Sequence, residues 1–197
     1  MAHLEYHFDI VCPYAYLGST QIQALCEKHQ ATLSWHAVLL GGMLKSVKVD
    51  PMFTTKLSPA KAKHNVLDMY RHADMMGVPF HFNPLHPIRT VQVQRALIAA
   101  DSPAVLIHKL YEAYWVDSVD LSQPKALKDV IDSVGLDGAG ILEETENPAL
   151  KLKLREATDA VVARGAFGVP AMFVDEEFVW GQDRLHFVER LLQGGAI

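Results

Sequence analysis

The sequence has little cysteine, no excess of positive charge and no long apolar run. Its two cysteines, Cys12 and Cys26, are too few for a disulfide scaffold and favour a reducing compartment, the cytoplasm. The formal net charge of -5 argues against nucleic acid or an anionic membrane as the main partner. No apolar run approaches the roughly 20 residues of a membrane helix, and the first residues are not typical of a secretory signal.

Motifs for nucleotides and metals are also missing. No Gly-x-Gly-x-x-Gly or Walker loop follows a predicted strand, so a nucleotide cofactor is not indicated. His64, Asp68 and His72 are spaced to share one helical face and could bind zinc. Because no His-Glu-x-x-His and no cysteine pair accompanies them, solvated or cofactor-facing histidines are favoured, and no metal site is predicted.

The first forty of the 197 residues have the pattern strand, helix, strand. Residues His3 to Phe8 alternate between Leu4, Tyr6 and Phe8 on one side and polar residues on the other, which indicates a strand with one face more buried. Pro13 suits the first position of a helix that continues to about Lys28. Residues 32–39, rich in β-formers, predict a second strand.

Helical periodicity dominates the middle of the chain. Gly41-Gly42 marks the exit from the second strand, residues 46–59 predict a loop, and the proline-rich residues 79–87 predict an irregular connection. Five helices are expected. Their predicted bounds are Pro59–Met76, Thr90–Ala100, Ala104–Val116, Pro124–Val134 and Pro148–Ala163.

The strand pattern returns near the end of the chain. Residues 171–174 and 178–180 predict a hairpin, and an amphipathic helix follows to about Leu192. The whole order predicts an α/β thioredoxin fold, with a four-stranded mixed sheet interrupted by a helical insertion. We expect a discontinuous thioredoxin-like domain of residues 1–42 and 165–197, and a helical domain of residues 43–164.

Cys12 stands between the first predicted strand and the helix that starts at Pro13. Several backbone N–H groups lack partners at a helix start, and their partial positive charge favours an anion. Such a position typically lowers the pKa of a cysteine and yields the reactive thiolate. An isolated cysteine is more often buried and inert. The strand-Cys-Pro-helix context reverses that preference, and we expect Cys12 to be the reactive centre.

Ala15 stands where a dithiol redox enzyme has the second cysteine of Cys-x-x-Cys. Cys26 cannot replace it, because 11 residues of helix separate it from Ala15, roughly 16 Å. A disulfide needs Cα atoms within about 7 Å. Cys26 also falls among apolar residues, which favours a core position. A single thiol must therefore work with an external thiol or take no part in redox chemistry.

Two further motifs lie after the helical region. In Gly168-Val169-Pro170 the X-Pro bond could be cis, although only about one in twenty is, and a strand-initiating proline is the simpler interpretation. In a thioredoxin fold, this backbone can pair with an extended thiol peptide as an added strand does. Asp183 is a candidate N-cap of the last helix. A helix start with an acid also suits the carboxylate and ammonium of a γ-glutamyl group.

Three motifs in this order resemble the 2-hydroxychromene-2-carboxylate isomerase family. These isomerases belong with the kappa-class glutathione transferases in the DsbA-like branch of the thioredoxin superfamily. The resemblance spans nearly the whole chain and includes Asp68 and Arg95. The motifs are Phe8-Asp9-x-x-Cys12-Pro13-Tyr14-Ala15-Tyr16-Leu17, Gly168-Val169-Pro170 and Trp180-Gly181-Gln182-Asp183-Arg184-Leu185.

The resemblance implies glutathione as the cofactor and a catalytic residue at Cys12, where the family usually has a serine that hydrogen-bonds the glutathione sulfur. It also implies a small aromatic substrate and a homodimer. An asparagine that contacts glutathione in relatives is absent near Val49 and Asp50. The cofactor-binding residues implied on this sequence are Pro13, Lys61, Val169, Pro170, Gln182, Asp183 and Arg184.

The exchange of serine for Cys12 leaves alternatives open. In a glutathione-dependent isomerase or transferase, as the family implies, a thiolate adds reversibly to a conjugated aromatic carboxylate, and the bond rotates. A thiol is also a far better nucleophile than a hydroxyl, so Cys12 could serve a monothiol disulfide oxidoreductase with external glutathione. A third hypothesis is a non-catalytic binding or chaperone module. The motifs and the missing second cysteine favour the isomerase.

The substrate pocket has apolar candidates in the helical insertion. These are Met43, Phe53, Met75 and Trp115, although each residue of this kind is more often part of the core.

Overall fold

A mixed four-stranded sheet lies at the centre of the computed structural model, which describes residues 2–52 and 56–196. The strands are ordered β2-β1-β3-β4; β1 runs parallel to β2 and antiparallel to β3, and β4 completes a hairpin with β3. The predicted thioredoxin-type sheet is confirmed. The strands are β1 (His3–Phe8), β2 (Thr32–Ala37), β3 (Ala171–Val174) and β4 (Glu177–Trp180).

The two faces of β1 differ, as the alternating sequence predicts. Leu4, Tyr6 and Phe8 are fully buried, and the Tyr6 hydroxyl donates a 2.8 Å hydrogen bond to the Ala15 carbonyl of α1 (Pro13–Lys28). The other face carries His3, Glu5 and His7. Because β1 and β2 are parallel and in register, Ser34 lies beside Glu5 and His36 beside His7.

The inserted segment between β2 and β3 is helical. The five predicted helices are present with ends within one residue of the predicted bounds, and α9 (Leu185–Leu192) closes the chain. Residues 79–87 are irregular, as predicted. The five helices are α3 (Pro59–Met76), α4 (Val91–Ala99), α5 (Ala104–Trp115), α6 (Pro124–Ser133) and α8 (Pro148–Ala163).

A short helix, α2 (Leu40–Ser46), replaces the turn that Gly41-Gly42 predicts. The N–H group at its first residue is hydrogen-bonded by a side chain outside the helix: Leu40 N donates to Asp9 Oδ2 at 2.9 Å. A Cβ on Gly42 would come within 3.3 Å of the Thr158 side chain on α8, so the glycine permits close packing of the two helices. Tertiary contacts thus override the local preference of the glycine pair. β2 accordingly ends at Ala37, two residues before the predicted end.

A second short helix, α7 (Gly138–Glu144), is also absent from the prediction. Its N-cap is Asp137, whose carboxylate accepts a 3.0 Å hydrogen bond from Gly140 N. At seven residues the helix is too short for a clear hydrophobic period. The loop predicted over residues 46–59 is irregular where it is described, and residues 53–55, with the pocket candidate Phe53, lie outside the described residues.

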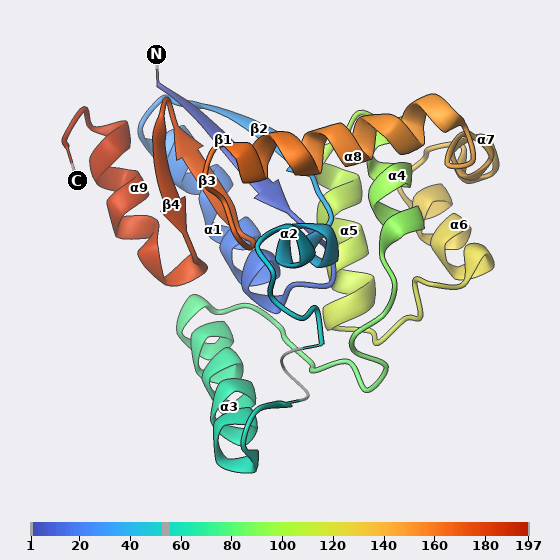
Figure 1. Cartoon of the computed structure of the whole chain (residues 1–197), viewed down its shortest axis with the longest axis horizontal. Coiled ribbons are helices and arrows are strands. Elements are labelled where there is room, and N and C mark those ends of the chain that lie inside the picture. Colours follow the sequence, from blue (N-terminus) through green and yellow to red (C-terminus); the bar gives the residue numbers. More distant parts are fainter. Residues whose placement is uncertain (1, 53–55, 197) are drawn as a thin grey trace.

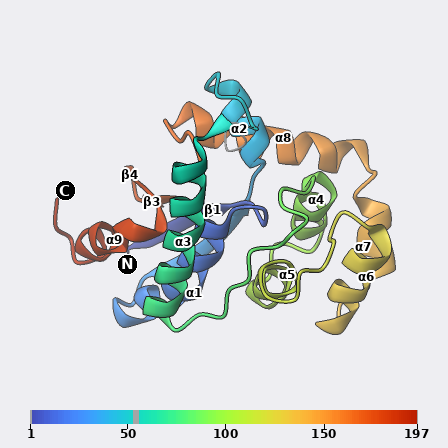
Figure 2. The same ribbon diagram turned by 90° about the horizontal axis from the view of Figure 1, so that it is seen from below.

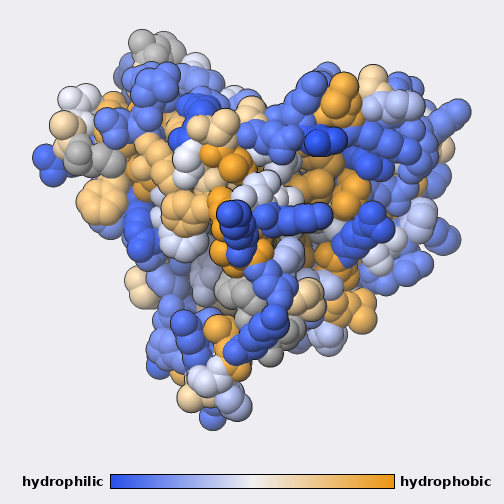
Figure 3. Space-filling view, in the orientation of Figure 1, coloured by the Kyte–Doolittle hydropathy of each residue, from blue (hydrophilic) through white to orange (hydrophobic). Residues whose placement is uncertain are grey.

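The helices surround the sheet unevenly (Figure 1). Helices α4 to α7 lie on one side of the sheet, and α8 runs from them across to the strands, while α3 lies below the sheet. Seen from below, α3 runs across the molecule in front of α1 (Figure 2). Figure 3 shows hydrophilic residues over much of α3 and around α6 and α7, with hydrophobic residues gathered nearer the middle of this face. Buried residues of sheet and insertion form one core, so the two-domain division stays a prediction.

None of the helices among residues 2–52 and 56–196 is long and apolar enough to cross a membrane.

Candidate active site

Cys12 occupies the N-cap position of α1, with an extended backbone and Pro13 next in the helix. Its N–H donates to the Asp9 carbonyl at 3.0 Å, which closes the turn after β1. The side chain is only 6 % exposed. Its Sγ donates a 3.3 Å hydrogen bond to the Val169 carbonyl. The fold therefore brings the cysteine motif and the Val169-Pro170 motif, 157 residues apart, into direct contact.

The expected low pKa of Cys12 is wrong. Burial raises the pKa of its thiol to about 12, and the negative charge of Asp9 adds to the rise. Hydrogen bonds from the backbone N–H groups of Ala15 and Tyr14 act in the opposite direction, as the helix start predicts, but they are outweighed. Cys12 is therefore a neutral thiol at neutral pH, and a neutral thiol can donate a hydrogen bond through its S–H.

Asp9 is a buried carboxyl beside this cysteine. Its Oδ1 accepts a hydrogen bond from Val11 N at 3.3 Å, and its Oδ2 accepts one from Leu40 N at 2.9 Å. Burial raises its pKa to about 6, although these bonds and one from Thr90 lower it. Sequence reasoning included Asp9 in the motif without assigning it a role. Its position two residues before Val11 is the signal of an Asx turn.

The peptide bond between Val169 and Pro170 is cis. Neither residue belongs to β3, whose pairing with β1 begins at Ala171. The Val169 carbonyl accepts a hydrogen bond from the Cys12 thiol. The Val169 N–H has no hydrogen-bond partner among the described residues. This short backbone segment can therefore accept one more extended strand, as the sequence predicts.

A cavity of about 540 Å³ opens directly beside Cys12. Its wall is mainly apolar and includes Leu40 and Leu44 of α2 and Met69 of α3. Arg89 and Asp9 also line it, and no hydrogen bond or ion pair of the Arg89 side chain with the described residues is observed. A mainly apolar cavity with such a cation suits a flat apolar molecule that carries an acid group.

Gln182 and Asp183 line a second cavity, also of about 540 Å³, between α1, α3 and α9. The Gln182 residue is only 5 % exposed, yet its side-chain amide has no hydrogen-bond partner among the described residues. The amide atoms are not among the buried polar atoms that lack a partner, so they are accessible from the cavity, where water or a polar ligand can bind them. His72 and Met75 of α3 form the opposite wall.

Asp183 is not the N-cap of the last helix, contrary to the sequence prediction. It lies inside the short 3-10 helix η2 (Gln182–Arg184), and the residue that precedes α9 is Arg184. The Asp183 Oδ1 accepts a 2.8 Å hydrogen bond from Arg184 Nη1 instead. Arg184 also donates to the Trp180 carbonyl at 3.3 Å, so its guanidinium is held by its own neighbours.

Tyr14 lines the cavity beside Cys12. Burial, together with the charges of Cys12, Asp68 and Asp183, raises the pKa of its hydroxyl. Those three groups therefore lie around one side chain. Tyr14 was part of the sequence motif but was assigned no role.

Other predicted residues lie away from the cysteine. Lys61 is exposed in the first turn of α3 and lines neither cavity. Met43 and Trp115 are fully buried core residues, whereas Met75 is 81 % exposed. On α3, His72 Nε2 lies 3.7 Å from Asp68 Oδ2, so this histidine pairs with a carboxylate as a surface group does.

Comparisons with known proteins agree with this geometry. A family model described as a DSBA-like thioredoxin domain matches residues 3–193. The 2-hydroxychromene-2-carboxylate isomerase of Pseudomonas putida is 25 % identical over 190 residues, which cover 94 % of this chain and 92 % of that protein. Human glutathione S-transferase kappa 1 is also 25 % identical, over 96 % of this chain and 90 % of its own.

A solved structure of a 2-hydroxychromene-2-carboxylate isomerase superposes on this chain with a TM-score of 0.83. The two chains are 21 % identical, and the match covers 98 % of this chain and 95 % of the other. At that level of identity the likeness concerns the fold. It confirms the predicted arrangement of sheet and inserted helices.

Proposed function

Because the chain belongs to the DsbA-like thioredoxin domain family, and is similar to isomerases along nearly its whole length, we propose that it is a glutathione-dependent isomerase. The reaction proposed is the cis-trans isomerisation of an aromatic, conjugated carboxylate of the 2-hydroxychromene-2-carboxylate type, by reversible thiol addition. A relative named glutathione S-transferase kappa 1 supports the choice of cofactor. A homodimer and a cytoplasmic location remain predictions.

One observation carries the proposal: Cys12 is a buried, protonated thiol that lines an apolar cavity and contacts the Val169 backbone. Its S–H donates to the Val169 carbonyl. A neutral thiol at this position can act as a serine hydroxyl does, by donating a hydrogen bond to a sulfur anion. Burial disfavours its own thiolate and so disfavours attack by Cys12 itself.

The residues around Cys12 suit glutathione. The unpartnered Val169 N–H and its carbonyl match the backbone of an extended peptide, and the unpartnered Gln182 amide and the Asp183 carboxylate match a γ-glutamyl end. When bound, glutathione would supply the sulfur nucleophile whose reversible addition frees a double bond to rotate. Tyr14, which lies near both Cys12 and Asp183, would border the tripeptide between these ends.

The chain's own groups prepare the reaction in the cavity beside Cys12. Its mainly apolar wall lowers the local polarity, which strengthens hydrogen bonds and charge contacts inside. The Arg89 guanidinium offers a cation for the substrate carboxylate, which orients the conjugated system in the cavity. The Cys12 S–H, which donates to the Val169 carbonyl in the free chain, would turn from it to donate to the glutathione sulfur and stabilise its negative charge.

The decisive assay is turnover of 2-hydroxychromene-2-carboxylate with and without glutathione, followed by absorbance. We expect a rate that depends on glutathione. Cys12→Ala removes the S–H donor and should lower kcat by about 10²- to 10³-fold, as loss of a comparable donor does. Cys12→Ser keeps a donor and should retain activity within about tenfold. Cys26→Ala is the matched control and should leave the rate unchanged, because Cys26 lies 2 % exposed within the core.

The same variants distinguish the isomerase from the alternative hypothesis, a monothiol disulfide oxidoreductase. If Cys12→Ser abolishes reduction of a glutathionylated peptide that the unmodified chain reduces, and no glutathione-dependent isomerisation is seen, Cys12 is a nucleophile and the proposal is wrong. Absence of both activities, together with no heat of glutathione binding, would instead favour a non-catalytic module.

Gln182→Leu tests where glutathione lies. Loss of the amide should raise the KM for glutathione several-fold with little change in kcat, because the amide would contact the cofactor equally in ground and transition states. Gln21→Leu, on the α1 wall of the same cavity, is the matched control, and its KM should change less.

A further inference from the structure

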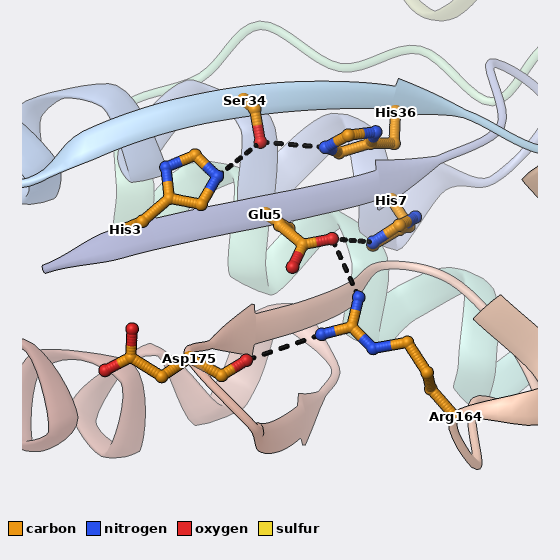
Figure 4. A network of polar contacts seen from close by, with 7 residues as sticks. All are labelled: His3, Glu5, His7, Ser34, His36, Arg164 and Asp175. Carbon is orange, nitrogen blue, oxygen red and sulfur yellow. Dashed lines mark hydrogen bonds and ion pairs between the residues drawn. The ribbon is translucent and has the colours of Figure 1, made fainter. Parts of the chain in front are cut away.

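The face of the sheet that points away from α1 carries a cluster of titratable side chains that the proposed reaction does not use (Figure 4). Glu5 and His7 lie on β1, and the register of the parallel strands places His36 of β2 beside His7. One ligand atom from each of the three residues lies within 4.8 Å of the other two. We propose that Glu5, His7 and His36 bind a first-row divalent metal ion, preferably Zn²⁺.

The donor set fits this ion. Two imidazoles and one carboxylate, with a fourth position open to water, form a known zinc donor set. In a tetrahedral zinc site with bonds of about 2.0–2.1 Å, ligand atoms lie roughly 3.3 Å apart. The three side chains therefore need to close by at most roughly 1.5 Å, which small side-chain rotations supply.

Two neighbouring strands hold the cluster. His7 and His36 are directly paired across β1 and β2, and their rings stack with centroids 4.6 Å apart. The Ser34 hydroxyl lies 2.8 Å from His36 Nε2 and 3.0 Å from His3 Nε2, and so fixes the His36 ring from outside the cluster. Such outer contacts orient metal-binding histidines and raise affinity.

Unused lone pairs distinguish this cluster from a closed hydrogen-bond network. His7 is 6 % exposed; its Nε2 lies 3.2 Å from Glu5 Oε2, while its Nδ1 is buried without a partner among the described residues. Glu5 uses Oε2 for both of its observed contacts, to His7 and Arg164, and Oε1 has no contact with the described residues. The Glu5 carboxylate therefore keeps an oxygen available for a further ligand.

Glu5 and His36 are partly exposed, which leaves a path for an ion from solvent.

Arg164 opposes the ion with its positive charge. Its Nη1 donates to Glu5 Oε2 at 2.8 Å, and its guanidinium lies over the Phe173 ring at 3.8 Å. Replacing this cation by an uncharged side chain of similar length should tighten metal binding, because a positive charge in contact with the Glu5 carboxylate is removed. The arrangement thus makes a prediction that a purely structural network does not.

The test is calorimetric titration of the tag-free, chelator-treated full chain with ZnCl₂, with circular dichroism to confirm folding. We expect one Zn²⁺ per chain. His36→Ala should weaken binding at least tenfold, and Arg164→Met should tighten it roughly tenfold. His72→Ala is the matched histidine control, because His72 lies on α3 near a single carboxylate. Cys12→Ser tests for binding by the thiol, and both variants should bind as the unmodified chain does.

Substitution of CoCl₂ for ZnCl₂ gives a second readout. A cobalt site with these ligands should show visible absorption bands that disappear in His36→Ala and persist in His72→Ala. The proposal is overturned if no Zn²⁺ binds, if His36→Ala and His72→Ala weaken binding equally, if Cys12→Ser abolishes it, or if Arg164→Met leaves the affinity unchanged. None of these outcomes depends on whether the chain is an isomerase.

Discussion

The two faces of β1 differ in chemistry: one is apolar and packs in the core, and the other is polar and carries ionisable side chains. Leu4, Tyr6 and Phe8 face α1 and are fully buried, so their contribution is packing. The intervening His3, Glu5 and His7 contact polar groups of β2 and Arg164. The strand then ends at the turn that carries Cys12.

Burial acts on ionisable groups of both regions in the same way. It lowers the pKa of the base His7 to about 4 and raises the pKa of the acid Cys12 to about 12. In each case the neutral form is favoured, because a low-dielectric interior penalises charge of either sign. The difference between the regions lies in what a neutral group can still do: His7 offers a lone pair, and Cys12 offers a proton.

The largest expected effect is on the packed face. Phe8→Ala should lower the free energy of unfolding by about 3–5 kcal/mol, because it removes a fully buried ring from the core. Glu5→Ala, on the opposite face of the same strand, should lower it by no more than about 1 kcal/mol. Urea unfolding followed by circular dichroism measures both. Equal losses would show that the polar face contributes to stability as the core does, and would break the comparison.

The next effect concerns the protonation of Cys12. With a pKa of about 12, the thiolate fraction at pH 8 is roughly 10³-fold below that of a thiol of pKa 9.0. Iodoacetamide should therefore modify native Cys12 slowly at pH 8, with a rate that rises up to and beyond pH 10. Mass spectrometry of Cys26→Ala isolates the signal of Cys12, and a urea-unfolded sample gives the unhindered rate. If the modification rate of the native chain levels off near pH 7, the pKa of Cys12 is low, as its position at the helix start predicts, and not raised by burial.

The two faces of β1 could be predicted from sequence, since period-two alternation is a local property. The helices α3 and α8 were predicted with their observed bounds for the same reason, as each has a proline at its start and a regular apolar period. The missed helix α2 depends on distant partners, Asp9 and Thr158, which no local pattern contains.

The sites show the same limit. A place for the Val169-Pro170 backbone at the thiol site was expected, because in a thioredoxin fold this backbone can pair with an extended thiol peptide. The raised pKa of Cys12 was not, because it depends on how completely the surrounding chain buries the thiol. The cluster of Glu5, His7 and His36 was missed because it requires the register between β1 and β2, which sequence alternation leaves open.

A smaller effect tests a polar atom on the packed face. Tyr6→Phe removes the hydroxyl that donates to the Ala15 carbonyl inside the core and should lower the free energy of unfolding by about 1–2 kcal/mol. Tyr70→Phe is the control. Tyr70 lies on α3, and its hydroxyl accepts an exposed hydrogen bond from the backbone N–H of Phe82. Urea unfolding should show a smaller loss there, and equal losses would mean that burial of the bond is irrelevant.

The smallest effect is on the polar face. Arg164→Met removes a partly exposed charge that bonds Glu5 at 2.8 Å, but its side chain can still cover the Phe173 ring. The free energy of unfolding should fall by less than about 1 kcal/mol, and the loss should shrink in 0.5 M NaCl, because salt screens the lost attraction. Arg155→Met, which removes an exposed cation 3.6 Å from Asp159, is the control and should change stability less. A larger, salt-independent loss would mean that Arg164 stabilises β1 by packing, so that both faces of the strand hold the fold by the same means.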